Sequence, residues 1–335
     1  MALYCGIDLH SNNHVLVIID EKDKRLVEKT LPNDLSCSLR ELQPYKRRLK
    51  GIAVESTFNW YSLVDGLMAA GYPLRLVNTC AVKQYEGLKY SDDKHDAFWL
   101  AHLMRLAILP TGYIYPKEKR SLRDLLRRRM KLVRLRSTQI LSLQNQLWRS
   151  QGGKVSSHTI QTKRFAPRVD EPFLQQALNS DLVCLRTLQQ QIRQIEQTVE
   201  AEVQDDPRFA LLRTVPGIGL ILALTILLET GDIRRFASVG DYASYCRCVR
   251  SERLSNGKKK GEGNQKCGNK YLSWAFSEAA HFILRFEPRA KRFYDRKYKK
   301  TNGIIAIRAL AHKVARAVYF ILRDEIPFKA EKLFV

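Results

Sequence analysis

The order of β-rich and helical segments at the amino-terminal end is the feature that most limits the possible folds. Three β-rich runs come first, separated by turn formers, at residues 3–8, 14–20 and 25–30. Helical and β-rich stretches then alternate, with helices near 34–49, 59–70 and 94–106 and strands at 51–55 and 73–77. Three antiparallel strands followed by parallel βα units describe an α/β domain of the RNase H-like type.

The remainder of the sequence is mainly helical in pattern. Apolar residues at three- and four-residue spacing predict one long helix from 117 to 148, and residues 151–168 have the composition of a linker. A second polar helix, at 180–204, has apolar residues at near-heptad spacing, so it could pair with a copy of itself. A compact helical domain begins after Asp206-Pro207. We therefore expect three parts: an α/β domain with the long helix at 1–150, a linker and coiled coil at 151–205, and a mainly helical domain at 206–335.

The net charge points to the partner. Lys and Arg number 57 against 34 Asp and Glu, which gives a formal charge of +23. A surplus of this size and sign favours binding to phosphate polymers, so nucleic acid is the expected partner. Because no apolar run approaches the roughly 20 residues needed to span a bilayer, we do not expect a membrane role. The amino terminus lacks the pattern of a secretion signal, so we expect a cytoplasmic protein. The seven cysteines lack paired spacing and are expected to be reduced core residues.

The predicted long helix concentrates this charge. Between residues 117 and 136 it carries ten Lys or Arg and two acids. Exposed helices usually mix the two signs, so we favour contact with a nucleic-acid backbone over a merely solvated face. The residues assigned to that contact are Arg120, Arg123, Arg127, Arg128, Lys131 and Arg134.

Four acidic residues have the spacing of a metal-dependent nuclease. Asp8 ends the first predicted strand and Glu55 ends the fourth, while Asp93 and Asp96 lie one turn apart at the start of a helix. In an RNase H-like domain these positions converge, and clustered carboxylates are the ligands that Mg²⁺ prefers. The alternative is that Asp93 and Asp96 only complement a helix N-terminus, which is the interpretation adopted for Asp92.

A Gly-rich turn opens the second domain. In Val215-Pro216-Gly217-Ile218-Gly219 the peptide N–H groups could grip a DNA phosphate, which assigns Gly217 and Gly219 to nucleic-acid binding. A helix junction that serves only close packing is an equal alternative.

These motifs together resemble a known family. The chain resembles the Piv/MooV-like transposases, the insertion-sequence family numbered one hundred and ten, in five motifs that occur in the same order. These are GIDLH with Asp8, AVES with Glu55, SDDKHDA with Asp93 and Asp96, VPGIG, and the block 254–277. The resemblance covers nearly the whole chain. It implies a RuvC-like domain, a coiled-coil insertion and a transposase domain that contributes a serine nucleophile. It also implies partners: donor and target double-stranded DNA, a structured non-coding "bridge" RNA that pairs with both, and further copies of the chain in a dimer or tetramer.

By this resemblance the nucleophile is Ser255, in a Gly- and Lys-rich segment that would otherwise be described as a flexible basic loop. A serine hydroxyl is a weak nucleophile, so attack on phosphorus requires nearby positive charge and an activating metal or base. Lys258, Lys259 and Lys260 would hold the phosphodiester, and Mg²⁺ on the four acids would stabilise the reacting oxygens. Ser251 and Ser244 stay open as alternative nucleophiles.

Two other functions fit the same residues. A junction-resolving nuclease of the RuvC kind would use the acids with water as the nucleophile and would not need Ser255. A non-catalytic nucleic-acid-binding protein would use the acids only for structure. Substitution of Ser255 and titration with Mg²⁺ distinguish the three.

Overall fold

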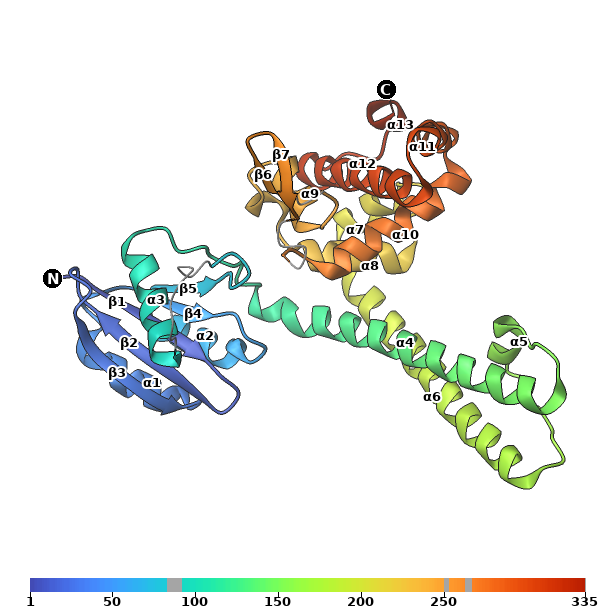
Figure 1. The fold of residues 1–335 in the computed structure, drawn as a ribbon, viewed down its shortest axis with the longest axis horizontal. Coiled ribbons are helices and arrows are strands. Elements are labelled where there is room, and N and C mark those ends of the chain that lie inside the picture. Colours follow the sequence, from blue (N-terminus) through green and yellow to red (C-terminus); the bar gives the residue numbers. More distant parts are fainter. Residues whose placement is uncertain (83–91, 250–252, 263–266, 335) are drawn as a thin grey trace. The chain divides into compact units, whose positions relative to one another are not determined.

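A computed structural model describes residues 1–82, 92–249, 253–262 and 267–334. The chain folds as two compact units, Met1–Lys117 and Glu118–Val335, and each is described by itself (Figure 1). Across the described residues, no helix is long and apolar enough to cross a membrane.

The first unit is built on a five-stranded mixed sheet. Its strands are β1 (Leu3–Leu9), β2 (Asn13–Ile19), β3 (Arg25–Pro32), β4 (Leu49–Glu55) and β5 (Leu74–Val77). Their order is β3-β2-β1-β4-β5, in which β1–β2 and β2–β3 pair antiparallel, and β1–β4 and β4–β5 pair parallel. The predicted strands and their α/β class are therefore confirmed.

Helices cover both faces of this sheet (Figure 1). On one face, α1 (Leu35–Leu42) and α2 (Trp60–Ala69) pack on alternate residues of β1 and β4, among them Cys5, Ile7 and Ile52. On the other face, α3 (Asp93–Arg105) packs on β2 through Ala97 and Ala101. The helix expected at 34–49 is shorter than predicted because a 3₁₀ turn that contains a proline, Gln43–Tyr45, follows α1.

The second unit begins with two long helices that lie side by side (Figure 1). They are α4 (Lys117–Gln151) and α6 (Pro172–Val203), and the short α5 (Ser157–Gln161) lies between them in the expected linker. The second long helix starts before residue 180 because the carboxylate of Glu171 caps it, accepting the N–H groups of Phe173 and Leu174.

The near-heptad face of α6 is used within the chain. Leu182 and Leu185 pack with Leu143 and Leu147 of α4, and Ile192 belongs to the same buried cluster as Leu126. The expectation that this face pairs with a copy of itself is therefore wrong, because α4 already buries it. Oligomerisation would need another surface.

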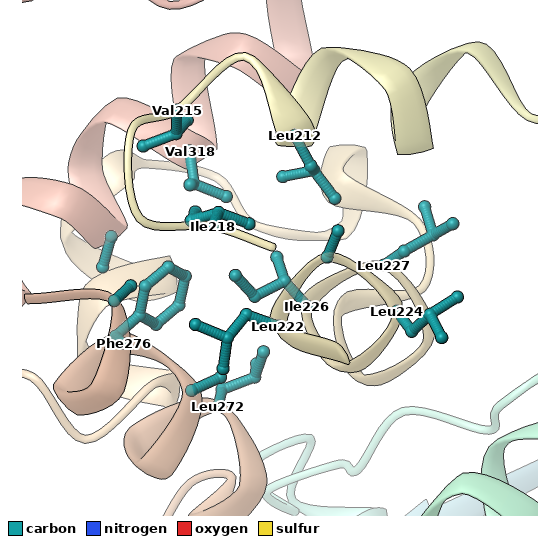
Figure 2. Close-up of a cluster of buried hydrophobic side chains, with 14 of the residues drawn as sticks. Leu212, Val215, Ile218, Leu222, Leu224, Ile226, Leu227, Leu272, Phe276 and Val318 are labelled. Atoms are coloured by element: carbon teal, nitrogen blue, oxygen red, sulfur yellow. The ribbon is translucent and has the colours of Figure 1, made fainter. Parts of the chain in front are cut away.

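The remaining helices of the second unit enclose one hydrophobic core. They are α7 (Pro207–Arg213), α8 (Leu220–Thr230), α9 (Val239–Tyr245), α10 (Lys270–Phe286), α11 (Pro288–Lys300), α12 (Gly303–Asp324) and α13 (Ala330–Leu333), with a 3₁₀ turn at Ile233–Arg235. Figure 2 shows Ile218 and Leu222 pointing toward Phe276 in this core. A two-stranded hairpin, β6 (Arg253–Ser255) and β7 (Lys258–Gly261), interrupts the helices. The mainly helical character predicted for this part is confirmed.

All seven cysteines are free, as expected for reduced thiols. Only Cys5 and Cys246 are buried, whereas Cys80 and Cys184 are exposed. The expectation of core cysteines is therefore wrong for most of them.

Candidate active site

Strand register places two of the predicted acids beside each other. The parallel pairing of β1 and β4 sets Ile7 opposite Val54, so the next residue on each strand, Asp8 and Glu55, are neighbours at the same edge of the sheet. Side chains alternate along a strand, so Asp8 shares a face with Gly6. A Cβ atom at Gly6 would lie 1.9 Å from the carbonyl oxygen of Ala97 in α3. Asp8 therefore projects on the side covered by α3, where it is 5% exposed.

The close approach at Gly6 brings the start of α3 to the same edge. Asp93 and Asp96 both lie in the first turn of α3. Asp92 is the N-cap, and its carboxylate accepts the N–H of His95 at 2.8 Å, as expected for this residue. Asp92 therefore caps the helix, whereas Asp93 and Asp96 lie within its first turn.

The four predicted carboxylates form one cluster. The Glu55 side chain hydrogen-bonds with Asp8, and the charge of Asp96 also acts on it. Burial, this hydrogen bond and the two neighbouring charges raise the pKa of Glu55 to about 8. Such crowding of acids is costly unless protons or a cation neutralise part of the charge.

His10 joins this cluster, and the sequence interpretation missed it. Its Nε2 lies 3.1 Å from Oδ2 of Asp8 and 3.2 Å from Oδ2 of Asp93, so it bridges two of the predicted acids. Its backbone is held in place: the carbonyl oxygen accepts the side-chain amides of Asn33 and Asn59, each at 2.8 Å. The signal was present in GIDLH, because residues 8 and 10 of an extended segment point to one face.

The cluster fits a divalent cation. Asp8, His10 and Asp93 offer ligand atoms that all lie within 4.8 Å of one another. Although Nε2 of His10 lies near two carboxylates, it is buried and forms no hydrogen bond with the described residues. A cation between these groups would use this nitrogen and relieve the repulsion among the acids. Carboxylates suit Mg²⁺ or Mn²⁺, and an imidazole is more usual on transition metals.

The serine segment of the second unit is a β-hairpin instead of the loop suggested by its composition. Asn256 and Gly257 form its two-residue turn with φ of 50° and 71°, values typical of a type I′ turn. Ser255 pairs with Lys258 across the strands, so their side chains project to the same face. Ser255 and all three lysines of β7 are exposed. Lys259 lies 3.7 Å from Glu262 in an ion pair. Of the alternative nucleophiles, Ser244 is exposed at the end of α9, and Ser251 lies outside the described residues.

The basic residues assigned on α4 occupy two different settings. Arg127 forms a two-pronged ion pair with Glu229 of α8, Arg120 is only 4% exposed, and Arg123 is half-buried. Arg128, Lys131 and Arg134 are exposed. The second group keeps the geometry expected for contact with a phosphate backbone, whereas Arg127 is engaged in packing the second unit.

The Gly-rich turn connects α7 to α8. Gly217 has φ of 91°, and a Cβ atom there would lie 2.6 Å from the backbone nitrogen of Ile283 in α10. Gly217 is therefore required for close packing, the alternative considered from the sequence. Gly219 is the N-cap of α8 and has open space around its Cα.

Comparison with known proteins is consistent with this arrangement. A model of the DEDD transposases of the IS110 type matches residues 5–150, which include all four acids. A second model, "Transposase IS116/IS110/IS902 family", matches residues 209–295, which include the Gly-rich turn and the serine hairpin. The chain belongs to this family of transposases.

Individual relatives agree with the family. The transposase is 24% identical over 297 residues to a "Probable family 20 transposase" of Pseudomonas aeruginosa, covering 83% of this chain and 85% of the relative. It is 23% identical over 292 residues to the "Transposase for insertion sequence element IS1111A" of Coxiella burnetii, covering 81% of this chain and 76% of the relative. The protein is therefore a DNA transposase, and DNA is a partner.

Proposed function

We propose that this transposase cleaves and rejoins DNA through a covalent phosphoserine at Ser255, assisted by Mg²⁺ on Asp8, Glu55, Asp93 and Asp96 and guided by a structured RNA. The acid cluster at the ends of β1 and β4 and the start of α3 is the observation that carries this proposal. The sheet order β3-β2-β1-β4-β5 supports a RuvC-like, RNase H-like domain around it.

The metal site would involve five side chains. His10 adds an imidazole to the four predicted carboxylates. When bound, Mg²⁺ would stabilise the negative charge that develops on the phosphodiester oxygens. The raised pKa of Glu55 is consistent with a site that needs a cation before all of its carboxylates can be charged.

The β6–β7 hairpin would supply the nucleophile, Ser255. The Ser255 Oγ would bond to phosphorus and lose its proton to solvent, while the bond from phosphorus to one deoxyribose oxygen breaks and that oxygen leaves as a hydroxyl. A hydroxyl of the second DNA strand would then reverse the step and release Ser255, so rejoining needs no ATP. Lys258, which faces the same side of the hairpin, would place positive charge beside the phosphate. Ser255 belongs to the second unit and the acids to the first, so this chemistry would require both units to bind the DNA that is cleaved.

The exposed basic residues would hold the nucleic acids. Arg128, Lys131 and Arg134 on α4 are suited to backbone contact, and the N-terminus of α8 at Gly219 is suited to a phosphate. Guidance by a bridge RNA follows from the family resemblance and is consistent with the formal charge of +23. An RNA that pairs with the DNA would carry the sequence specificity, and the protein would act as a dimer or tetramer.

The test is strand exchange on a plasmid that carries the joined ends of the element, with the RNA that copurifies with the protein. Ser255→Ala should abolish the covalent protein–DNA adduct and strand exchange, yet retain Mn²⁺ binding by calorimetry. Glu55→Gln, nearly isosteric, should lose both metal binding and cleavage, with a rate loss of about a thousandfold or more.

Two variants serve as matched controls. Ser244→Ala removes another exposed serine hydroxyl, and Asp92→Asn removes a carboxylate next to the cluster but keeps a capping side chain. Both should retain activity. Cleavage by Ser255→Ala without an adduct would instead support a water-dependent nuclease, and full activity of Glu55→Gln would refute the metal site.

A further inference from the structure

The second unit contains a basic cavity that none of the chemistry above uses. It has a volume of about 520 Å³ and lies among the segment after α9, one face of α10, the end of α11 and the first turns of α12. A cavity of this size accommodates a ligand as large as a nucleotide.

The charge of its lining has one sign. Arg247, Lys297, Arg308 and His312 line the cavity, and no acidic residue is among its described lining residues. Lys297 and Arg308 form no ion pair in the described part of the chain, although Lys291 on the same helix as Lys297 is paired with Asp295 at 2.7 Å. The charges of Lys297 and Arg308 at this hollow create a positive potential that attracts an anion.

His312 lies in the cavity wall and is half-buried. Burial lowers its pKa, and the charges of Arg316 and Lys313, which lie outside the cavity lining, lower it further. An anion in the cavity would act on this imidazole directly.

The wall at Arg247 is held in an unusual conformation. Its φ of 55° lies in the left-handed region, which is rare for a residue with a side chain. Its Nε donates to the carbonyl oxygens of Cys267 at 3.0 Å and Gly268 at 3.2 Å, which holds the guanidinium group at the cavity. Such strain persists where the surrounding structure enforces it, and it is often found at binding sites.

The rest of the lining is apolar or bears hydroxyl groups. Val249 is 49% exposed and Ile304 is 73% exposed, which leaves apolar surface for the flat face of a base. Ser273 and Ser277 add hydroxyls from α10. Cationic and apolar groups side by side match a nucleotide better than a free phosphate ion.

We propose that this cavity holds one unpaired nucleotide of a bound nucleic-acid strand, with its phosphate against Arg308, Lys297 and Arg247 and its base against Val249 and Ile304. The inference rests on the proposed handling of nucleic acid and adds a specific site to it. Val249 precedes Ser255 by six residues, so their Cα atoms are at most about 22 Å apart. A nucleotide held in the cavity would therefore lie within a few nucleotide lengths of the phosphate that Ser255 attacks.

The experiment measures binding by the full-length protein and leaves catalysis out. Fluorescein-labelled oligothymidylate, as DNA, and oligouridylate, as RNA, are titrated over a series of salt concentrations and followed by anisotropy. Arg308→Gln and Lys297→Gln should each weaken binding about three- to tenfold. Each should also reduce the slope of log affinity against log salt by about 0.7, the value for one lost phosphate contact on a single strand.

The matched control is Arg316→Gln, which removes the same charge from an exposed position on the same helix, outside this cavity. It should have a smaller effect on affinity. A second measurement follows the side-chain signals of His312 by NMR during addition of thymidine monophosphate. They should shift in the wild type and in Arg316→Gln at similar concentrations, and only at about three- to tenfold higher concentrations in Arg308→Gln.

The effect is expected with at least one of the two oligonucleotides, and the one that responds identifies the strand as DNA or RNA. The proposal is overturned if Arg308→Gln and Lys297→Gln bind both strands as tightly as Arg316→Gln does and His312 does not respond to the nucleotide. Loss of catalytic activity in Ser255→Ala has no bearing on this result, so the two proposals fail separately.

Discussion

Replacement of Arg127 by Met should destabilise the second unit strongly, because the ion pair it forms holds α4 against α8. Glu229 is 3% exposed, and its carboxylate accepts Nε of Arg127 at 2.6 Å, Nη2 of Arg127 at 2.7 Å and the side-chain amide of Asn269 at 2.7 Å. The substitution removes two of these three hydrogen bonds and leaves a buried charge without its cation. Breaking a buried pair in this way costs about 3–5 kcal/mol. Because the Arg127 side chain is 30% exposed, we expect the lower end, about 3 kcal/mol.

Thermal and urea unfolding of the full-length protein measure this loss. A unit of this length should lose about 6–12 °C in its unfolding midpoint for about 3 kcal/mol. Arg127→Lys keeps the charge but loses the two-pronged geometry, so it should cost about 1–2 kcal/mol. Arg128→Met is the control: Arg128 is exposed and has no ion pair in the described part of the chain, so the change should stay within about 0.5 kcal/mol. A cost for Arg127→Met no larger than that for Arg128→Met would refute the reasoning.

Three further outcomes follow from the geometry. Between pH 4.5, its ordinary pKa, and about pH 8, Glu55 keeps its proton in the folded protein but loses it in the unfolded chain. Without divalent ions, the free energy of unfolding should therefore fall as pH rises through this range. Thermal unfolding in EDTA measures this dependence, and Glu55→Gln should flatten it. Gly217→Ala should lower the free energy of unfolding by about 2–4 kcal/mol in urea, because Gly217 has a φ of 91° and lies against α10. Gly219→Ala should lower it by less than about 1 kcal/mol. Similar losses for the two variants would contradict the packing role of Gly217. Arg128→Gln and Lys131→Gln should each lower the salt dependence of duplex DNA binding by about 0.9 in log–log slope, and unchanged slopes would remove α4 from the DNA interface.

The interaction that holds Arg127 could not be predicted from its position in the sequence. Arg127 and Arg128 are adjacent, and both belong to the run of basic residues on one helix. Glu229 lies 102 residues further along the chain, so nothing local separates the buried arginine from the exposed one. A helix presents neighbouring residues about 100° apart, and the packing partner alone decides which of them is enclosed.

The near-heptad spacing of α6 illustrates the same limit. The spacing correctly predicted a helix with one apolar face, because that face has to be buried. It did not identify the partner, since a seam of this kind fits a second copy as well as a preceding helix of the same chain. Leu182 and Leu185 pack against α4, which precedes α6 in the same chain and is joined to it by residues 152–171.

The sequence by itself determined the strands, the long helices and the four acids at strand and helix ends, because alternation and helical periodicity record which side of each element is buried. Tertiary structure decided what meets across elements: that Gly6 lets α3 approach β1, and that His10 reaches Asp93. It also decided that Arg308 and Lys297 line one cavity with His312. These contacts depend on distances between residues that are remote along the chain, and local pattern carries no record of such distances.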